Sequence, residues 1–260
     1  MPSKQPTLYH GQHNALLLKM DKEVKANTII AGFPGFGLVG TITAGYIAEH
    51  LKAEKIGTAW SEDQPATVAI HENNIMSPIT IYYDKNNKIL IINGITSSQR
   101  IEWRIAQLIN DISKRTKAKQ VITIEGVGSN TTGDGRQTPD SSTRTPATYY
   151  YTTSDKEKKK LESIGIKPLQ EGIIMGVTSA LIIQPEIQLT TLFAEAHAQL
   201  PDSKAAATII QTLDKYLGLN VDYKPLLKQA EALEQKLKTM LQQGQEAQKQ
   251  QEDKTENYFG

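Results

Sequence analysis

Short runs of β-branched residues alternate with helical patterns along most of the chain, and this alternation constrains the fold more than any other feature. Each run is apolar and is bounded by glycine, proline, asparagine or charged residues, which is typical of buried strands. The runs lie at residues 28–31, 67–71, 79–83, 89–92, 120–124 and 172–177. Apolar residues at helical spacing predict helices at residues 38–51, 98–114, 178–184, 189–198 and 203–217. This alternation predicts an α/β fold with parallel strands at the centre of the sheet.

One pair of predicted strands is joined by a segment too short to hold a helix. Residues 84–88 read Asp-Lys-Asn-Asn-Lys, which is typical of a hairpin turn between the runs at 79–83 and 89–92. Such a hairpin adds an antiparallel pair to the sheet. We therefore expect a three-layer α/β/α sandwich around a mixed, mostly parallel sheet.

A glycine-rich loop at residues 32–40 is the most distinctive motif. Gly35-x-Gly37-x-x-Gly40 follows a predicted strand and opens a predicted helix, which is the context in which this spacing binds a dinucleotide. Glu62 and Asp63 follow at roughly the distance expected of a ribose-binding acid. A small-molecule or nucleotide-binding enzyme that uses the Gly32 to Gly40 loop is therefore one hypothesis.

The same glycines have a second interpretation, in which they allow a tight turn and close packing of the helix on the sheet. Phe33, Pro34 and Phe36 fill the loop with apolar bulk. A phosphate cradle needs accessible backbone N–H groups, and proline has none. We favour the packing role for this loop, and we expect no cofactor there.

Charge and composition exclude several classes of protein. The chain has 260 residues, with 29 Lys and Arg against 28 Asp and Glu, so its net charge of +1 argues against a nucleic-acid binder. It has no cysteine, which excludes disulfides, thiolate metal ligands and cysteine nucleophiles. The sequence lacks both the long apolar run of a membrane span and the pattern of a secretory signal. We expect a cytoplasmic protein without membrane contact.

Candidate catalytic groups are sparse. The chain has five histidines, and no two of them have the spacing of a metal-binding pair on a helix: His10, His13, His50, His71 and His197. Glu125 to Gly128 follow a predicted strand, a position where α/β proteins often place ligand-binding groups. Glu171 precedes a predicted strand and Glu195 lies in a predicted helix, so solvated or capping roles are favoured over catalysis. The run of tyrosines at 149–151 is typical of a strand or an interface edge. We predict no catalytic residue and no metal site.

Two polar stretches lie outside the predicted core. Residues 129–148 contain no large apolar side chain, and a segment this long is functional, mobile or bound to a partner. Leucines and alanine at steps of three and four predict an amphipathic helix over residues 226–241, and Gln, Glu and Lys then dominate the chain. We expect three parts: an α/β domain at 1–225, a helix at 226–241 and a flexible tail at 242–260.

Several blocks of sequence occur in an order that resembles a known family. They read GFPGFGLVG at 32–40, IG at 56–57, SEDQP at 61–65, GVTSAL at 176–181, LFAEA at 192–196 and LGLNVD at 217–222. Together they resemble the archaeal proteasome-assembly-chaperone family, which is related to the second eukaryotic proteasome assembly chaperone. The resemblance implies a phosphorylase/hydrolase-like fold, a homo-oligomer and a strand at residues 189–193 in place of the helix that the spacing predicts.

The last three residues add to this resemblance. Some proteins of the family, like proteasome activators, end in a hydrophobic residue, a tyrosine and any third residue; here Tyr258, Phe259 and Gly260 take these places. An aromatic pair and a free carboxylate on a tether can enter a pocket and pair with a lysine there. The resemblance implies a non-enzymatic chaperone that binds proteasome α-subunits through this tail and promotes core-particle assembly. An alternative is a proteasome activator that uses the same tail to open the gate.

Overall fold

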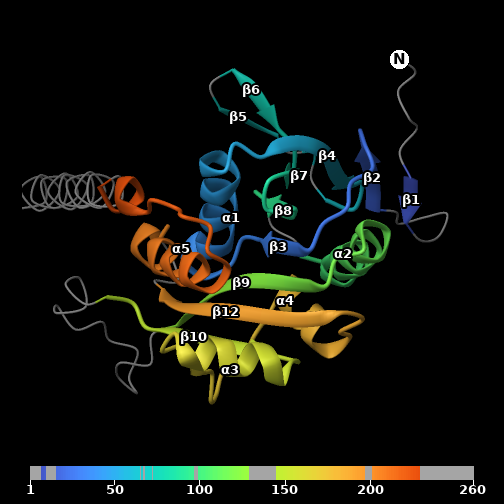
Figure 1. Ribbon diagram of the computed structural model, residues 1–260. Coiled ribbons are helices and arrows are strands. Elements are labelled where there is room, and N and C mark those ends of the chain that lie inside the picture. Colours follow the sequence, from blue (N-terminus) through green and yellow to red (C-terminus); the bar gives the residue numbers. More distant parts are fainter. Residues whose placement is uncertain are drawn as a thin grey trace, which may run out of the picture.

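A ten-stranded mixed sheet forms the centre of the molecule in the computed structural model, which describes residues 7–9, 16–64, 66, 68–71, 73–96, 99–128, 145–196 and 201–228 (Figure 1). In spatial order the strands are β1 (Thr7–Tyr9), β2 (Leu16–Met20), β4 (Glu54–Ser61), β7 (Ile79–Asp84), β8 (Ile89–Gly94), β3 (Thr28–Gly32), β9 (Gln120–Gly128), β12 (Gln188–Ala196), β10 (Thr148–Thr152) and β11 (Lys167–Pro168). The four central strands β8, β3, β9 and β12 are parallel. Antiparallel pairs flank them on both sides.

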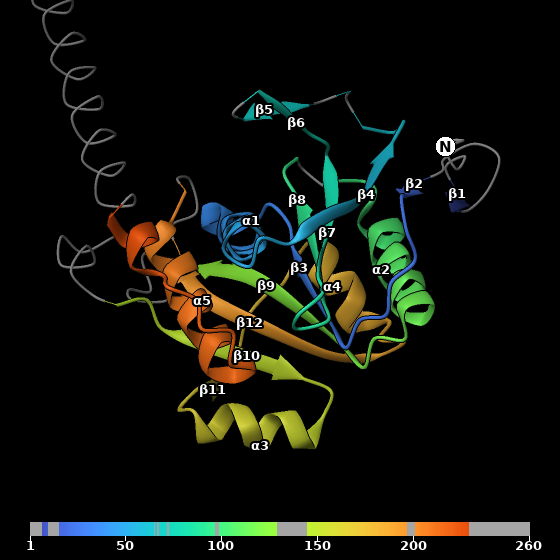
Figure 2. The ribbon, with the colours of Figure 1, turned by 45° about the horizontal axis from the view of Figure 1, so that its top comes forward.

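Helices cover both faces of the sheet and complete the expected α/β/α sandwich (Figures 1 and 2). Helices α1 (Val39–His50) and α5 (Ser203–Leu217) pack together on one face, and α2 (Glu102–Thr116) and α4 (Val177–Ile183) on the other. Neighbouring side chains of β3 enter different cores, because Ile30 packs under α1 and α5 whereas Ile29 packs under α2 and α4. Burial on both faces explains why the central strands are continuous apolar runs.

Three smaller elements complete the described chain. The 3₁₀ turn η1 (Phe36–Leu38) joins β3 to α1, and α3 (Asp155–Ser163) packs beside β10. Strands β5 (Ala69–His71) and β6 (Asn74–Met76) form a separate hairpin. Within the described ranges, no helix has the length and apolar character needed to cross a membrane.

Local sequence signals account for several elements that the sequence predicts. The Asp84 carboxylate accepts the backbone N–H of Asn86 at 2.9 Å and closes the predicted hairpin between β7 and β8. Asp202 caps α5 by accepting the N–H of Ala205 at 2.9 Å, and Gly218 ends that helix with a φ of 70°. Helix α5 therefore has the bounds that its apolar spacing predicts.

Three predicted elements are wrong in type or in burial. Residues 172–177 form an irregular segment and the start of α4, not a buried strand, and Ile173 is 89 % exposed. The spacing predicts a helix over residues 189–198, but residues 189–196 belong to β12, which pairs with β9, as the family resemblance implies, and residues 197 and 198 lie outside the described residues. The run at 67–71 contributes only β5 outside the main sheet, where Ile70 is exposed.

Four strands of the main sheet have no counterpart among the predicted elements: β1, β2, β4 and β11. Several predictions also fall outside the described residues. They concern residues 129–144 of the polar stretch, 229–241 of the C-terminal helix, the tail at 242–260, and His10, His13 and His197.

Candidate functional site

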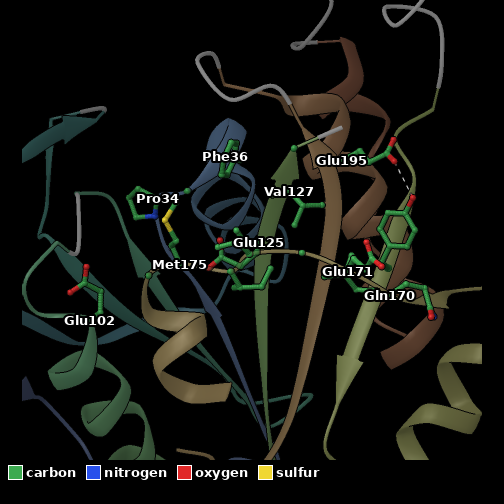
Figure 3. A pocket seen from close by; sticks show the side chains of 18 of the residues that line it. Pro34, Phe36, Glu102, Glu125, Val127, Gln170, Glu171, Met175 and Glu195 are labelled. Carbon is green, nitrogen blue, oxygen red and sulfur yellow. Dashed lines mark hydrogen bonds between the residues drawn. The ribbon is translucent and has the colours of Figure 1, made fainter. Parts of the chain in front are cut away.

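A cleft of about 840 Å³ opens at the carboxyl ends of β3, β9 and β12. Its walls come from the turn between β3 and η1, the start of α2, the end of β9, and the segment from 168 to 176 that leads into α4. Ligands of open α/β sheets bind at this edge, and the volume is typical of a small-molecule site. Figure 3 shows Glu125 near the middle of this cleft.

The glycine loop forms one wall of the cleft through close packing of backbone on backbone. A Cβ on Gly40 would lie 2.7 Å from the carbonyl oxygens of Ile124 and Phe33, and a Cβ on Gly32 would lie 2.0 Å from the carbonyl oxygen of Gly40. A Cβ on Gly126 would lie 2.1 Å from the carbonyl oxygen of Phe36. These positions exclude any side chain, so the geometry favours the packing role of the loop over a phosphate cradle.

Glu125 is a buried acid whose carboxyl group faces the cleft. It lies on β9, three residues before the strand ends at Gly128, and is only 8 % exposed. The Thr178 hydroxyl, from the first turn of α4, donates a hydrogen bond of 2.7 Å to its Oε1. A Cβ on Gly35 would lie 2.8 Å from Oε2 of Glu125, which is too close for a side chain at this position. A glycine at position 35 therefore leaves room for the Glu125 carboxyl group.

The burial of Glu125 changes its acidity. Desolvation raises the pKa of the Glu125 carboxyl from 4.5 to about 8, and the hydrogen bond from Thr178 opposes part of that rise. The group therefore holds its proton at neutral pH. Buried carboxyls with raised pKa values in a cleft are frequent at functional sites, where they act in binding or in proton transfer.

Three further glutamates line the cleft. Glu102 begins α2, Glu171 lies after β11, and Glu195 lies on β12. The Tyr149 hydroxyl donates a hydrogen bond of 3.0 Å to Oε1 of Glu195. Figure 3 shows Glu102 on one side of Glu125, and Glu171 and Glu195 on the other. Among the described residues that line the cleft, none is a lysine, an arginine or a histidine.

Apolar side chains occupy another part of the cleft wall. Met175 is 67 % exposed, and Ile173 and Ile174 line the cleft beside it on the segment before α4. Pro34 and Phe36 contribute apolar surface from the glycine loop. The cleft therefore combines an acidic interior with exposed apolar side chains.

The structure brings together some of the residues that the sequence singles out and separates others. Glu125, Glu171 and Glu195 all line the cleft, although Glu195 lies on a strand where the spacing predicts a helix, and no strand follows directly after Glu171. Asp63 instead forms an ion pair with Arg104 and does not line the cleft. The predicted docking residues lie beyond the described residues: Tyr258, Phe259 and Gly260.

Two positions of the site could not be predicted from the sequence. Thr178 lies 53 residues from Glu125 in the chain, and no local pattern indicates that their side chains meet. Gly35 was assigned to the glycine motif, but its specific feature is its closeness to a buried carboxyl. The one available signal was the position of Glu125 at the end of a buried strand.

Comparisons with known proteins agree with this fold. The sequence pattern of the PAC2 family matches residues 29–241. A crystal structure of Pyrococcus furiosus PbaA, described as an archaeal homolog of proteasome-assembly chaperone, has 31 % identity and a TM-score of 0.74 over 94 % of this chain and 99 % of its own.

Two further relatives are more distant. Pyrococcus furiosus PbaB, described as an archaeal proteasome activator, has 23 % identity and a TM-score of 0.69 over 86 % of this chain and 98 % of its own. An uncharacterized protein of Methanocaldococcus jannaschii is 23 % identical over 83 % of this chain and 85 % of its own length. Since the family pattern covers most of the residues, from the first central strand past the last described helix, the chain belongs to the PAC2 family.

Proposed function

We propose that this protein is a proteasome assembly chaperone that binds proteasome α-subunits and promotes assembly of the core particle. The observation that carries the proposal is the similarity to PbaA, at 31 % identity over 94 % of this chain. Similarity of that extent covers the whole α/β sandwich, and PbaA is described as an archaeal homolog of a proteasome-assembly chaperone.

The contact with the α-subunits is assigned to the C-terminal tail. Tyr258 and Phe259 supply two aromatic rings, and Gly260 supplies a free carboxylate. A pocket between neighbouring α-subunits that holds a lysine would pair with the carboxylate while the rings are buried. Several tails on a homo-oligomer would act together, because the first contact raises the local concentration of the others.

The proposal assigns no catalytic step to this protein and places it in the cytoplasm. It keeps three parts, the α/β domain at 1–225, a helix at 226–241 and a tail at 242–260. Residues 224–228 are helical, and Leu226 is buried against the core under α1 and α5. A helix that begins there is anchored to the sandwich, and it would hold the tail at a fixed starting point.

Reconstitution of core particles from α- and β-subunits tests the proposed role. We expect the full chain to accelerate the formation of core particles, and the chain without Tyr258, Phe259 and Gly260 to have no effect. An Asn257→Ala variant is the matched control, because it alters the tail just before the docking residues. Equal acceleration by the full and the shortened chain would refute the role of the tail.

A proteasome activator is the second candidate, and it is favoured by the similarity to PbaB. An activator opens the gate of the mature core particle, so it raises the rate of peptide hydrolysis. A peptidase assay on mature core particles separates the two roles: a chaperone leaves the rate unchanged, and an activator increases it. The same tail serves both roles, so deletion of the tail does not distinguish them.

A further inference from the structure

We propose that the cleft around Glu125 binds an aliphatic primary amine, whose ammonium group pairs with the Glu125 carboxylate and whose hydrocarbon chain lies against Met175 and Phe36. This site includes no residue of the C-terminal tail, and the proposed function does not depend on it. Four observations support it: the charge of the cleft, the state of the buried carboxyl, the apolar wall and the arrangement of the acids.

The charge of the cleft selects a cation. Its acidic residues come from four different elements or segments, and they are Glu102, Glu125, Glu171 and Glu195. Among the described lining residues there is no basic side chain to neutralise them. Like charges around a partly enclosed volume attract a cation and repel a carboxylate or a phosphate. An anionic nucleotide is therefore a poor ligand for this cleft.

The buried carboxyl offers a specific contact for that cation. Thr178 donates to Oε1 of Glu125, and among the described residues no hydrogen bond is made to Oε2. Glu125 is 8 % exposed, and it lines the cleft together with Gly35, the residue that faces Oε2. Oε2 is not among the fully buried side-chain oxygens that lack a partner in the described part of the chain, so it is open to the cleft, where an ammonium group can donate to it and supply the opposite charge.

The rest of the cleft favours an organic cation over a metal ion. Within the described ranges, no group of three or more acids or histidines is arranged to hold a metal ion. Met175 and Phe36 instead offer apolar surface, and Met175 is 67 % exposed without a ligand. A hydrocarbon chain would cover these side chains, and the flexible Met side chain adapts to ligands of different shape. An alkylammonium ion satisfies both the acid and the apolar wall.

Binding is coupled to the release of a proton. Burial raises the pKa of the Glu125 carboxyl to about 8, so at neutral pH the ammonium group displaces a proton, which passes to the solvent. The other titratable groups that face the cleft are Glu102 of α2, Glu171, Glu195 of β12 and Tyr149 of β10, and the glycine loop contributes none. Affinity should therefore rise with pH until Glu125 is ionised.

Isothermal titration calorimetry of the full chain with n-pentylamine tests this site. From about pH 6 to about pH 8.5 the ionised fraction of Glu125 grows, and we expect the affinity for pentylamine to rise roughly 80-fold. Pentanol and pentanoate, which have the same chain without the positive charge, should not bind. Absence of pentylamine binding at millimolar concentrations, or an affinity that does not change with pH, overturns the proposal.

Substitutions test whether Glu125 is the side chain that binds the ammonium group. In Glu125→Gln the amide oxygen still accepts from Thr178, but the charge is lost; we expect at least a tenfold loss of affinity at about pH 8.5 and no remaining pH dependence. Glu23→Gln, an exposed glutamate on the loop before β3, is the matched control and should bind like the original protein. Unchanged affinity in Glu125→Gln contradicts the assignment.

A second variant keeps the test valid if Glu125→Gln is unstable. Thr178→Val removes the donor that lowers the pKa of Glu125, so we expect the pH midpoint of binding to move to a higher pH. If the pH midpoint of pentylamine binding does not move in Thr178→Val, Glu125 is not the group that controls binding, and the proposal is overturned.

A final comparison distinguishes two sources of the same chemistry. Nα-acetyl-lysine methylamide carries the ammonium group on a peptide-like unit, whereas pentylamine represents a free metabolite. Binding of both supports a lysine side chain of another protein as the natural ligand, and binding of pentylamine alone supports a free amine. Binding of neither overturns the proposal.

Discussion

The buried acid Glu125 makes a quantitative prediction about stability. Its folded-state pKa of about 8 lies above the ordinary value of 4.5, so the folded protein holds a proton that the unfolded chain has released. A raised pKa contributes stability that is fully present below about pH 4.5 and is lost as the pH rises toward 8. Each pH unit in that window costs about 1.4 kcal/mol, which gives a total on the order of 5 kcal/mol.

The substitution Glu125→Gln isolates this contribution, because the glutamine has the same shape and no proton to lose. Urea unfolding of both proteins at about pH 5, 7 and 9 gives the free energy of unfolding at each pH. We expect the stability of Glu125→Gln relative to the original protein to increase by on the order of 4 kcal/mol across that range, because part of the change has already occurred at about pH 5. All other titrating groups are shared by the two proteins, so their effects cancel in the difference.

A difference that stays constant from about pH 5 to about pH 9 would refute the reasoning. It would mean that Glu125 titrates alike in the folded and the unfolded protein, and that burial does not control its proton. A relative stability of Glu125→Gln that falls as the pH rises would contradict the sign, since it requires a lowered pKa of Glu125 in the folded protein.

Two further predictions concern packing and helix capping. Gly126→Ala places a Cβ 2.1 Å from the carbonyl oxygen of Phe36, and the backbone must shift, so we expect a loss of about 3 kcal/mol in urea unfolding. Gly128→Ala, where a Cβ has no neighbour within 4 Å, is the matched control and should have little effect, and equal losses would contradict the packing argument. Asp202→Ala removes the cap of α5 and should lower the melting temperature through a loss of about 1 kcal/mol, whereas Asp202→Asn keeps an acceptor and should stay close to the original. Equal melting temperatures for the two substitutions at Asp202 would show that the cap does not stabilise the helix.

A helix with one buried face is predicted well from the sequence. On α5, Ile209, Ile210 and Leu213 are buried with the spacing of a helix, and polar residues occupy the other face. The predicted bounds of α5 therefore match the structure. Strand β12 is buried on both faces, so its apolar residues show no alternation, and the spacing between them imitates a helix. The family resemblance corrected that prediction where periodicity could not.

The incorrect strand at residues 172–177 has a different cause. Its residues are as apolar as those of a buried strand, but Ile173 and Met175 lie exposed at the cleft. Apolar composition predicts burial only where other elements cover the segment, and here the open cleft leaves it uncovered. This departure from the usual pattern coincides with the candidate binding site, where local rules are expected to fail.

The site itself was only partly predictable. The sequence places Glu125 directly after a predicted buried strand, a common position for ligand-binding groups, but it predicts no site residue there. Its partner Thr178 depends on how α4 packs against β9, which is a property of the whole fold. Likewise, the spacing of Gly35, Gly37 and Gly40 is typical of a ligand-binding loop. Only the short distances from a Cβ at Gly32 or Gly40 to nearby carbonyl oxygens show that this loop serves close backbone packing.

The proposed function requires the protein to bind proteasome α-subunits through its last three residues. The most direct test is the affinity of purified α-rings for the full chain, measured beside a chain that lacks Tyr258, Phe259 and Gly260. We predict saturable binding of the full chain and a loss of roughly 30-fold or more on deletion, as expected when buried aromatic anchors are removed. Equal affinities for the two chains would contradict the claim.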